Sequence, residues 1–323
     1  MKRFANILLI VDVRMDYSSV LQRGIRLARN NKAVLTVCAI VDTVPDEMQM
    51  GVIAITPREV LDIVVTEKRD WLDDTVKAAA ADGVPIDAKV LIGKPFIEII
   101  RQVLRNDHDL IIKCADVDSA LREMLFSSTD MHLMRKCPCP VWIVKPTDRP
   151  KYRRVLAAVD KDPEEPVKDV LNRQILEMST SLALAEYSEV HIVHAWSVFG
   201  EDVVRSHSWG FSEADFDTMV EKEAAARRRW LEGLVKNYSA SADKNTADGL
   251  DLHLHVIKGH AQNVVPEIAR NLAVDLVVMG TVARTGIAGF FMGNTAESIL
   301  TQLDCSVLTI KPPEFISPVT LGA

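Results

Sequence analysis

The chain has 323 residues, of which 48% are hydrophobic and 26% charged, and its net charge is −7. This globular balance excludes a disordered or fibrous protein, and the length predicts two domains. The acidic excess lies entirely in residues 151–323 and no dense Lys/Arg run is present, which argues against a nucleic-acid partner.

The targeting and cysteine patterns narrow the protein class further. No apolar run reaches the length of a membrane span, and no leader pattern with a cleavage site opens the chain, so we expect a cytoplasmic protein. The five cysteines include no CxxC, and a disulfide framework is not expected. Cys137 and Cys139 form the only close pair, which we interpret as buried thiols beside a strand rather than as a metal site.

The first half alternates predicted strands and helices. Near-continuous apolar runs predict buried strands at 6–11, 33–41, 84–91, 110–114 and 141–145. Ser18 or Ser19 is expected to cap the first helix. Thr56, Pro57 and Glu59 have the spacing of a capping box, which predicts a second helix that ends at Gly83. Two further helices are predicted, from Pro95 and over 129–136.

The second half repeats this order, with strands near 154–159, 190–196, 250–257, 275–280 and 306–311. From Gly93 onward the two copies keep a constant offset of 166 residues, as "CPVWIVKP" at 139–146 and "CSVLTIKP" at 305–312 illustrate. We therefore predict an α/β protein with two tandem, doubly wound, parallel five-stranded sheets. The expected domains are 1–146 and 151–312, followed by a tail at 313–323.

One glycine-rich segment distinguishes the second copy. Gly280, Gly286, Gly289 and Gly293 fall within fourteen residues, between a predicted strand end and a predicted helix start. Such a loop can present backbone amides to an anion, and the amides at the helix start attract phosphate. The alternative is that the glycines only form turns and that Asn294 caps the helix, with Glu297 three residues on.

The repeat, this loop and the closing "VLTIKP" resemble the universal stress protein family over nearly the whole chain. ATP-binding members carry Gly, two residues, Gly, nine residues, then Gly-Ser or Gly-Thr; here these positions are Gly280, Ala283, Gly293 and Asn294, so the spacing is intact but two positions differ. The resemblance implies ATP or another nucleotide as ligand. The phosphate side would be Gly280, Thr281, Val282, Ala283, Arg284, Gly293, Asn294 and Thr295, and the adenosine side Val159, Asp160, Ala195 and Met279.

The first copy departs from this pattern at every motif position. Cys114, Val117, Ser127 and Ser128 stand at the aligned positions, so we predict that the first copy does not bind ATP. The resemblance also implies that the two copies form an intramolecular pseudo-dimer through their fifth strands, and a homodimer of chains is possible.

No metal and no catalysis are predicted. His253 and His255 alternate on one strand and could ligate zinc, but we interpret them as a solvent-facing row, and His194 could line the ligand cleft. No catalytic motif is present. We expect a non-enzymatic stress-response protein that binds a nucleotide or other phosphate-bearing small molecule. Alternatives are a binder of a larger amphiphilic, lipid-like nucleotide-linked ligand, as Phe290–Met292 suggests, and a slow ATPase or autophosphorylating protein.

Overall fold

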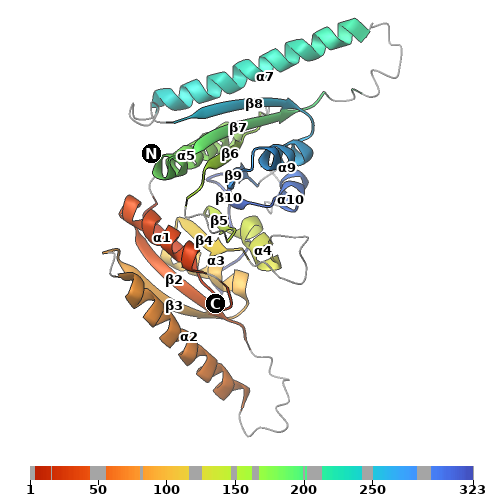
Figure 1. Ribbon diagram of the computed structural model, residues 1–323. Helices are drawn as coiled ribbons and strands as arrows, with labels where there is room; N and C mark the ends of the chain where they lie inside the picture. The colour runs from red at the N-terminus through yellow and green to blue at the C-terminus, as the bar shows by residue number, and fades with distance from the viewer. Residues whose placement is uncertain are drawn as a thin grey trace. The chain divides into compact units, whose positions relative to one another are not determined.

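The computed structural model describes residues 4–15, 17–43, 56–80, 83–115, 126–146, 151–161, 167–198, 201, 213–241, 250–281 and 292–322. These residues divide into two compact units (Figure 1). One unit contains the described residues of 4–146 together with 305–322, and the other contains those of 151–281 together with 292–304.

The unit of the first copy is built around a parallel sheet with the strand order β3-β2-β1-β4-β5. Its strands and helices alternate along the chain: β1 (Asn6–Ile10), α1 (Ser18–Asn31), β2 (Val34–Val41), α2 (Pro57–Ala80), β3 (Ile86–Ile92), α3 (Pro95–Asn106), β4 (Leu110–Cys114), α4 (Ser128–Lys136) and β5 (Val141–Val144). β1 and β4 lie at its centre and are buried almost completely, as strands covered by helices on both faces must be.

The fifth strand of the second copy, β10 (Ser306–Ile310), belongs to this same unit and pairs antiparallel with β5. Leu308 lies opposite Trp142, and both side chains are almost fully buried. The tail that follows also packs here, since the Ser317 hydroxyl donates to the Lys136 carbonyl at the end of α4. The predicted pairing of the two fifth strands is therefore present.

Two predicted helix starts had different outcomes. The capping box before α2 is confirmed: the Thr56 amide donates to Glu59 Oε2 at 2.8 Å, and the Glu59 amide donates to Thr56 Oγ1 at 3.3 Å. The predicted cap of α1 is wrong, because Tyr17 occupies the N-cap without a side-chain hydrogen bond and Ser18 already lies in the helix.

The other unit has the strand order β9-β6-β7-β8, all parallel, which matches β4-β1-β2-β3 of the first copy. Its elements are β6 (Arg154–Ala158), α5 (Val167–Glu186), β7 (Glu189–Trp196), α7 (Glu213–Ser241), β8 (Leu252–Lys258), α9 (Ala261–Asn271), β9 (Leu276–Gly280) and α10 (Asn294–Leu300). The α/β fold with its parallel strands and alternating helices is confirmed.

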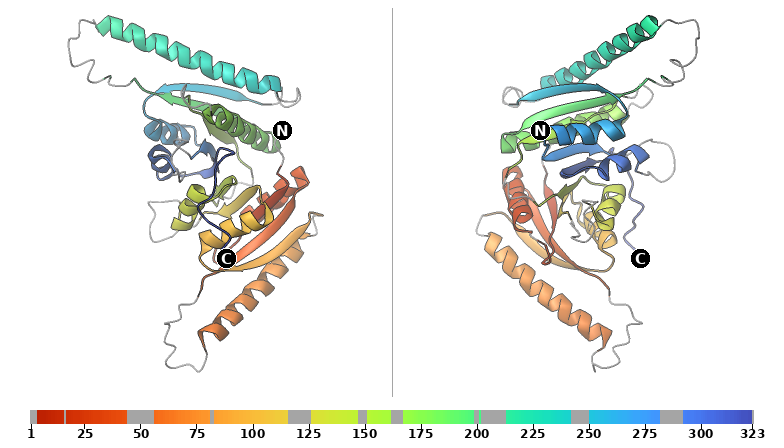
Figure 2. Two further views of the ribbon diagram at one scale, coloured as in Figure 1. Left: turned by 180° about the vertical axis from the view of Figure 1, so that it is seen from behind. Right: turned by 45° about the vertical axis from the view of Figure 1, so that its right-hand side comes forward.

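Helices cover both faces of these four strands (Figure 2). Connections between parallel strands are right-handed. Connections that run in opposite directions across a sheet therefore place their helices on opposite faces. The ring of His194 on β7 contacts Trp230 of α7, whereas its neighbours Val193 and Ala195 share a pocket with Val265 of α9. Among the described helices, none is both long and apolar enough to cross a membrane.

Candidate functional site

A pocket of about 230 Å³ lies at the carboxyl ends of β6, β7 and β9, where ligands bind in open α/β sheets. Its interior is apolar and is formed by side chains from every surrounding element, such as Ile175, Val193, Val265, Met279 and Ile299. Polar groups are confined to a few places in the lining: Asp160, Lys168, Asn172, Thr281 and Thr295. This combination suits a ligand with a flat apolar part and a polar or charged end.

The segment after β6 is held by a buried asparagine. Asn172 of α5 is only 2% exposed; its Oδ1 accepts from the Asp160 amide at 3.0 Å, and its Nδ2 donates to the Asp160 carbonyl at 2.6 Å. The Asp160 carboxylate pairs with Lys168 Nζ at 2.7 Å and is 63% exposed. The carboxylate is thus fixed at the pocket while it stays open to solvent.

Gly280 is required by packing between β9 and α5. A Cβ atom at this position would lie 2.5 Å from Leu171 Cδ2, closer than any van der Waals contact permits. The φ angle of Gly280 is not positive, so its backbone conformation does not require glycine. The reason for glycine is the close contact with the Leu171 side chain of α5. The absence of a side chain at Gly280 therefore leaves room for the Leu171 side chain, which lines the pocket.

We expect Gly280→Ala to lower the free energy of unfolding by about 1–3 kcal/mol, because the added methyl overpacks against Leu171. Denaturant unfolding measures this. Adding Leu171→Val, which removes both δ carbons, should recover part of the loss. Gly233→Ala in α7 is the control: nothing lies within 4 Å of its Cβ, and the change should stabilise by about 0.5–1 kcal/mol. A Gly280→Ala protein of unchanged stability would contradict this packing.

The helix that follows the glycine segment begins at the pocket wall. Gly293 is the N-cap of α10, so the alternative in which Asn294 caps this helix is wrong. The Gly293 amide donates to the Thr281 carbonyl at 3.0 Å and joins the strand end to the helix start. The first-turn amides after it have no intrahelical acceptor, and Gly293 offers no side chain to cap them. Thr295 and Ala296, in this turn, line the pocket.

Most of the predicted site residues meet at this pocket. Eight of the predicted positions contribute to its lining: Val159, Asp160, Ala195, Met279, Gly280, Thr281, Gly293 and Thr295. Asn294 is exposed at the first position of α10. Val282, Ala283 and Arg284 lie outside the described residues, as do Phe290 and Phe291 of the suggested apolar lid. That any of these residues contacts a ligand stays a prediction.

His194 does not line the cleft, which corrects one expectation. It is 1% exposed, its Nδ1 lies 3.3 Å from the Val159 carbonyl, and its ring contacts Trp230 on the α7 face. Burial lowers its pKa. Since side chains alternate along a strand, Val193 and Ala195 take the pocket face and His194 takes the opposite one.

Sequence patterns did not predict three other lining residues, Lys168, Asn172 and Ala296. Of these three residues, only Asn172 has a signal in the sequence: it is a polar residue on the buried side of a helix, which indicates a specific hydrogen-bond partner. Ala296 becomes informative only through the offset between the copies, because its counterpart in the first copy is the charged residue Asp130.

In the first copy, a buried ion pair occupies the positions that form the pocket wall in the second. Lys113 and Asp130 align with Met279 and Ala296, and Lys113 Nζ lies 2.9 Å from Asp130 Oδ1. The Lys113 side chain is 9% exposed and that of Asp130 is fully buried. A charged pair thus stands where the second copy has two apolar pocket residues.

The start of α4 is also closed by its own side chains. Ser127 Oγ accepts from the Asp130 amide at 3.2 Å, and Asp130 Oδ2 accepts from the Ser127 amide at 2.9 Å, a complete capping box. The Asp130 carboxylate supplies the negative charge that a helix N-terminus favours. The second copy has Gly293 and Ala296 at these two positions, and neither residue can supply such a charge.

Comparison with known proteins agrees with this architecture. The model of the universal stress protein family matches residues 3–145 and again 151–311. The chain is 32% identical to universal stress protein E of Salmonella typhi, over 99% of this chain and 98% of that protein, and 26% identical to a homologue from Haemophilus influenzae, over 96% and 98%. A solved Pseudomonas aeruginosa protein of unknown function has a TM-score of 0.72 at 22% identity, over 96% of this chain and 94% of its own, which shows a shared fold. The chain therefore belongs to the universal stress protein family and carries two of its domains in tandem.

Proposed function

We propose that the second repeat binds one adenine nucleotide per chain, with the base and ribose in the apolar pocket and the phosphates at the start of α10. The observation that carries this proposal is the difference between two equivalent helix starts. The start of α4 is closed by Ser127 and Asp130, whereas α10 has neither side chain and begins in the pocket lining. First-turn amides without a capping side chain at the N-cap, next to an apolar cavity, support a ligand with an anionic end.

The Asp160 carboxylate is suited to the ribose. It is fixed by Asn172 through the backbone, stays solvent-exposed, and faces the pocket beside Lys168. A carboxylate accepts hydrogen bonds from vicinal hydroxyls, while a lysine at the same edge can approach a phosphate. The role we infer is that of a non-enzymatic regulator, in which binding shifts a conformational or partner equilibrium.

Calorimetric titration and native mass spectrometry of the full chain test this proposal, with ATP, AMP and adenosine as ligands. We expect one ATP per chain, bound at least about tenfold more tightly than adenosine, because the α10 amides contact only the phosphates. Two bound nucleotides, or equal affinity for ATP and adenosine, would contradict it. Steady-state phosphate release above the buffer rate would favour an ATPase instead.

Asp160→Ala should weaken ATP and adenosine binding by the same factor, since both ligands carry the ribose. Its matched control is Asp12→Ala, the residue that closes β1 in the first copy. Burial alone would raise the pKa of Asp12, but hydrogen bonds from Arg14 and the charge of Lys68 outweigh it and hold the pKa at about 2. The control should therefore lose stability at neutral pH but not nucleotide affinity. Equal loss of affinity in both variants would argue against a role for Asp160.

A further inference from the structure

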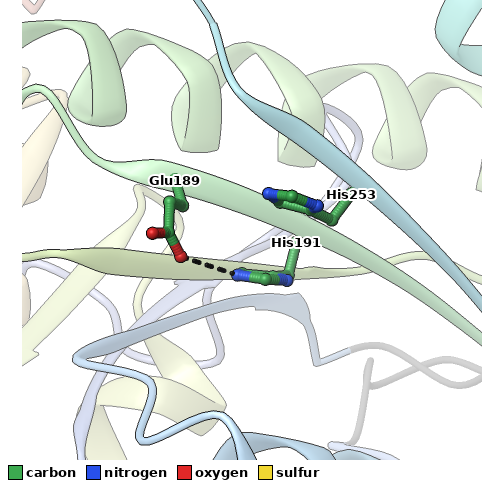
Figure 3. A group of neighbouring side chains, drawn as sticks. All are labelled: Glu189, His191 and His253. Atoms are coloured by element: carbon green, nitrogen blue, oxygen red, sulfur yellow. Dashed lines mark hydrogen bonds and ion pairs between the residues drawn. The ribbon is translucent and has the colours of Figure 1, made fainter.

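A second group of ligating side chains lies on β7 and β8, near the amino-terminal ends of these strands (Figure 3). The parallel register pairs His191 of β7 with His253 of β8. Glu189 precedes His191 by two residues on the same strand face. One ligating atom from each of Glu189, His191 and His253 falls within 4.8 Å of the other two.

The two imidazoles are oriented alike. Their rings stack at 4.7 Å between centroids with an interplanar angle of 17°. His191 Nε2 lies 3.4 Å from Glu189 Oε2, and His253 Nε2 lies 3.1 Å from Asp251 Oδ1. Both Nε2 atoms therefore face carboxylates, and Figure 3 shows Glu189 at the same end of both rings.

We propose that Glu189, His191 and His253 bind a divalent metal ion of the zinc type, with Asp251 next to the remaining coordination position. Two imidazoles and one carboxylate are a ligand set that zinc and its neighbours cobalt, nickel and copper accept. The side chains of His253 and Glu189 are 43% and 41% exposed, so an ion can reach them from solvent, while His191 is 6% exposed and anchors the site.

His255 is a positioning residue for this site. His191 Nδ1 lies 3.0 Å from His255 Nε2. With a metal on Nε2, His191 keeps its proton on Nδ1 and donates it to His255, the arrangement that orients metal-bound histidines.

Arg154 is the group that opposes binding. Its Nε donates to Glu189 Oε2 at 2.8 Å. The guanidinium charge repels a cation, but a carboxylate has two oxygens and can serve both partners. β8 is the last strand in the order of this unit, so a bound ion would fasten it to β7.

The test uses the full chain, untagged and stripped of metal, titrated with Zn²⁺ by calorimetry and with Co²⁺ by visible absorption. We expect one Zn²⁺ ion at this site, and at least about tenfold weaker binding in His253→Gln and in Glu189→Gln. His255→Gln should bind about 10–100-fold more weakly and change the Co²⁺ spectrum. The control is His260→Gln: His260 is exposed, makes no capping hydrogen bond, and should bind metal like the parent chain.

Stability provides a second measurement. Zn²⁺ should raise the melting temperature of the parent chain and of His260→Gln, but not that of His253→Gln, whose metal-free melting temperature should be unchanged. Unaltered Zn²⁺ affinity in both His253→Gln and Glu189→Gln would overturn the proposal. It would equally be overturned by a sulfur-to-cobalt charge-transfer band, which would place the ion on cysteines, or by the absence of Zn²⁺ binding at micromolar concentrations.

Discussion

The double substitution Met279→Lys and Ala296→Asp is expected to abolish nucleotide binding by the second repeat while the protein stays folded. It transfers the Lys113–Asp130 pair of the first copy to the aligned positions of the second. The new carboxylate would lie at the start of α10 and satisfy the amides that we assign to the phosphates. The two longer side chains would fill space that Met279 and Ala296 leave to the pocket.

Affinity for ATP should fall at least about 100-fold, which corresponds to about 2.8 kcal/mol. Calorimetry measures the affinity, and circular dichroism with denaturant unfolding verifies the fold. The first copy shows that this scaffold accommodates the pair, so a folded variant is expected. Met279→Leu keeps the size and polarity of the wall and serves as the control, with affinity close to that of the parent chain. Retained binding in the double variant would mean that the ligand is not held at α10.

Lys113→Met is expected to destabilise the protein by about 3–5 kcal/mol. It leaves the Asp130 carboxylate, which is fully buried, without its cationic partner. Lys113→Met combined with Asp130→Ala should regain most of this loss, because the pair is then replaced by the residues that occupy the same positions in the second copy. An apolar replacement of a buried ion pair is often neutral in stability.

Urea or guanidinium unfolding measures the stability of both variants. Independent substitutions would add their losses, whereas here the second substitution should reverse most of the first. Lys89→Met is the control, because its salt bridge with Asp87 is solvent-exposed, at 3.8 Å, and should change stability by no more than about 0.5 kcal/mol. If the double variant were less stable than Lys113→Met alone, the ion pair would not be the reason for the single-variant loss.

The comparison of the two copies explains why one scaffold retains a candidate site and the other does not. The glycine pattern distinguishes them at the level of sequence, through Gly293 against Ser127. The structure adds a physical difference: the Asp130 carboxylate lies at the helix start, where we propose that phosphate binds in the second copy, and Lys113 neutralises it. In this interpretation, the Asp130 carboxylate of the first copy replaces the negative charge that a bound phosphate would bring to the second copy.

Local patterns predicted much of the fold. Buried strands such as β4, at 110–114, follow directly from uninterrupted apolar runs, and the Thr56–Glu59 capping box depends only on residues three apart. Ligands bind beyond the carboxyl ends of parallel strands. Asp160 and Gly280 each lie at the end of a predicted strand of the second copy, and both line the pocket. The predicted cap of α1 was wrong because serine is only a preferred residue at the N-cap, and Tyr17 occupies this position in α1.

The sequence by itself therefore determined the repeat, the order of strands and helices, and the edge of the sheet at which a ligand is expected, because each depends on contacts between near neighbours or on a general rule of topology. Only the tertiary structure paired His191 with His253, set Leu171 against Gly280, and joined Lys113 to Asp130. These partners are separated by 62, 109 and 17 residues along the chain, and strand register and helix docking, which no local pattern encodes, bring their side chains together.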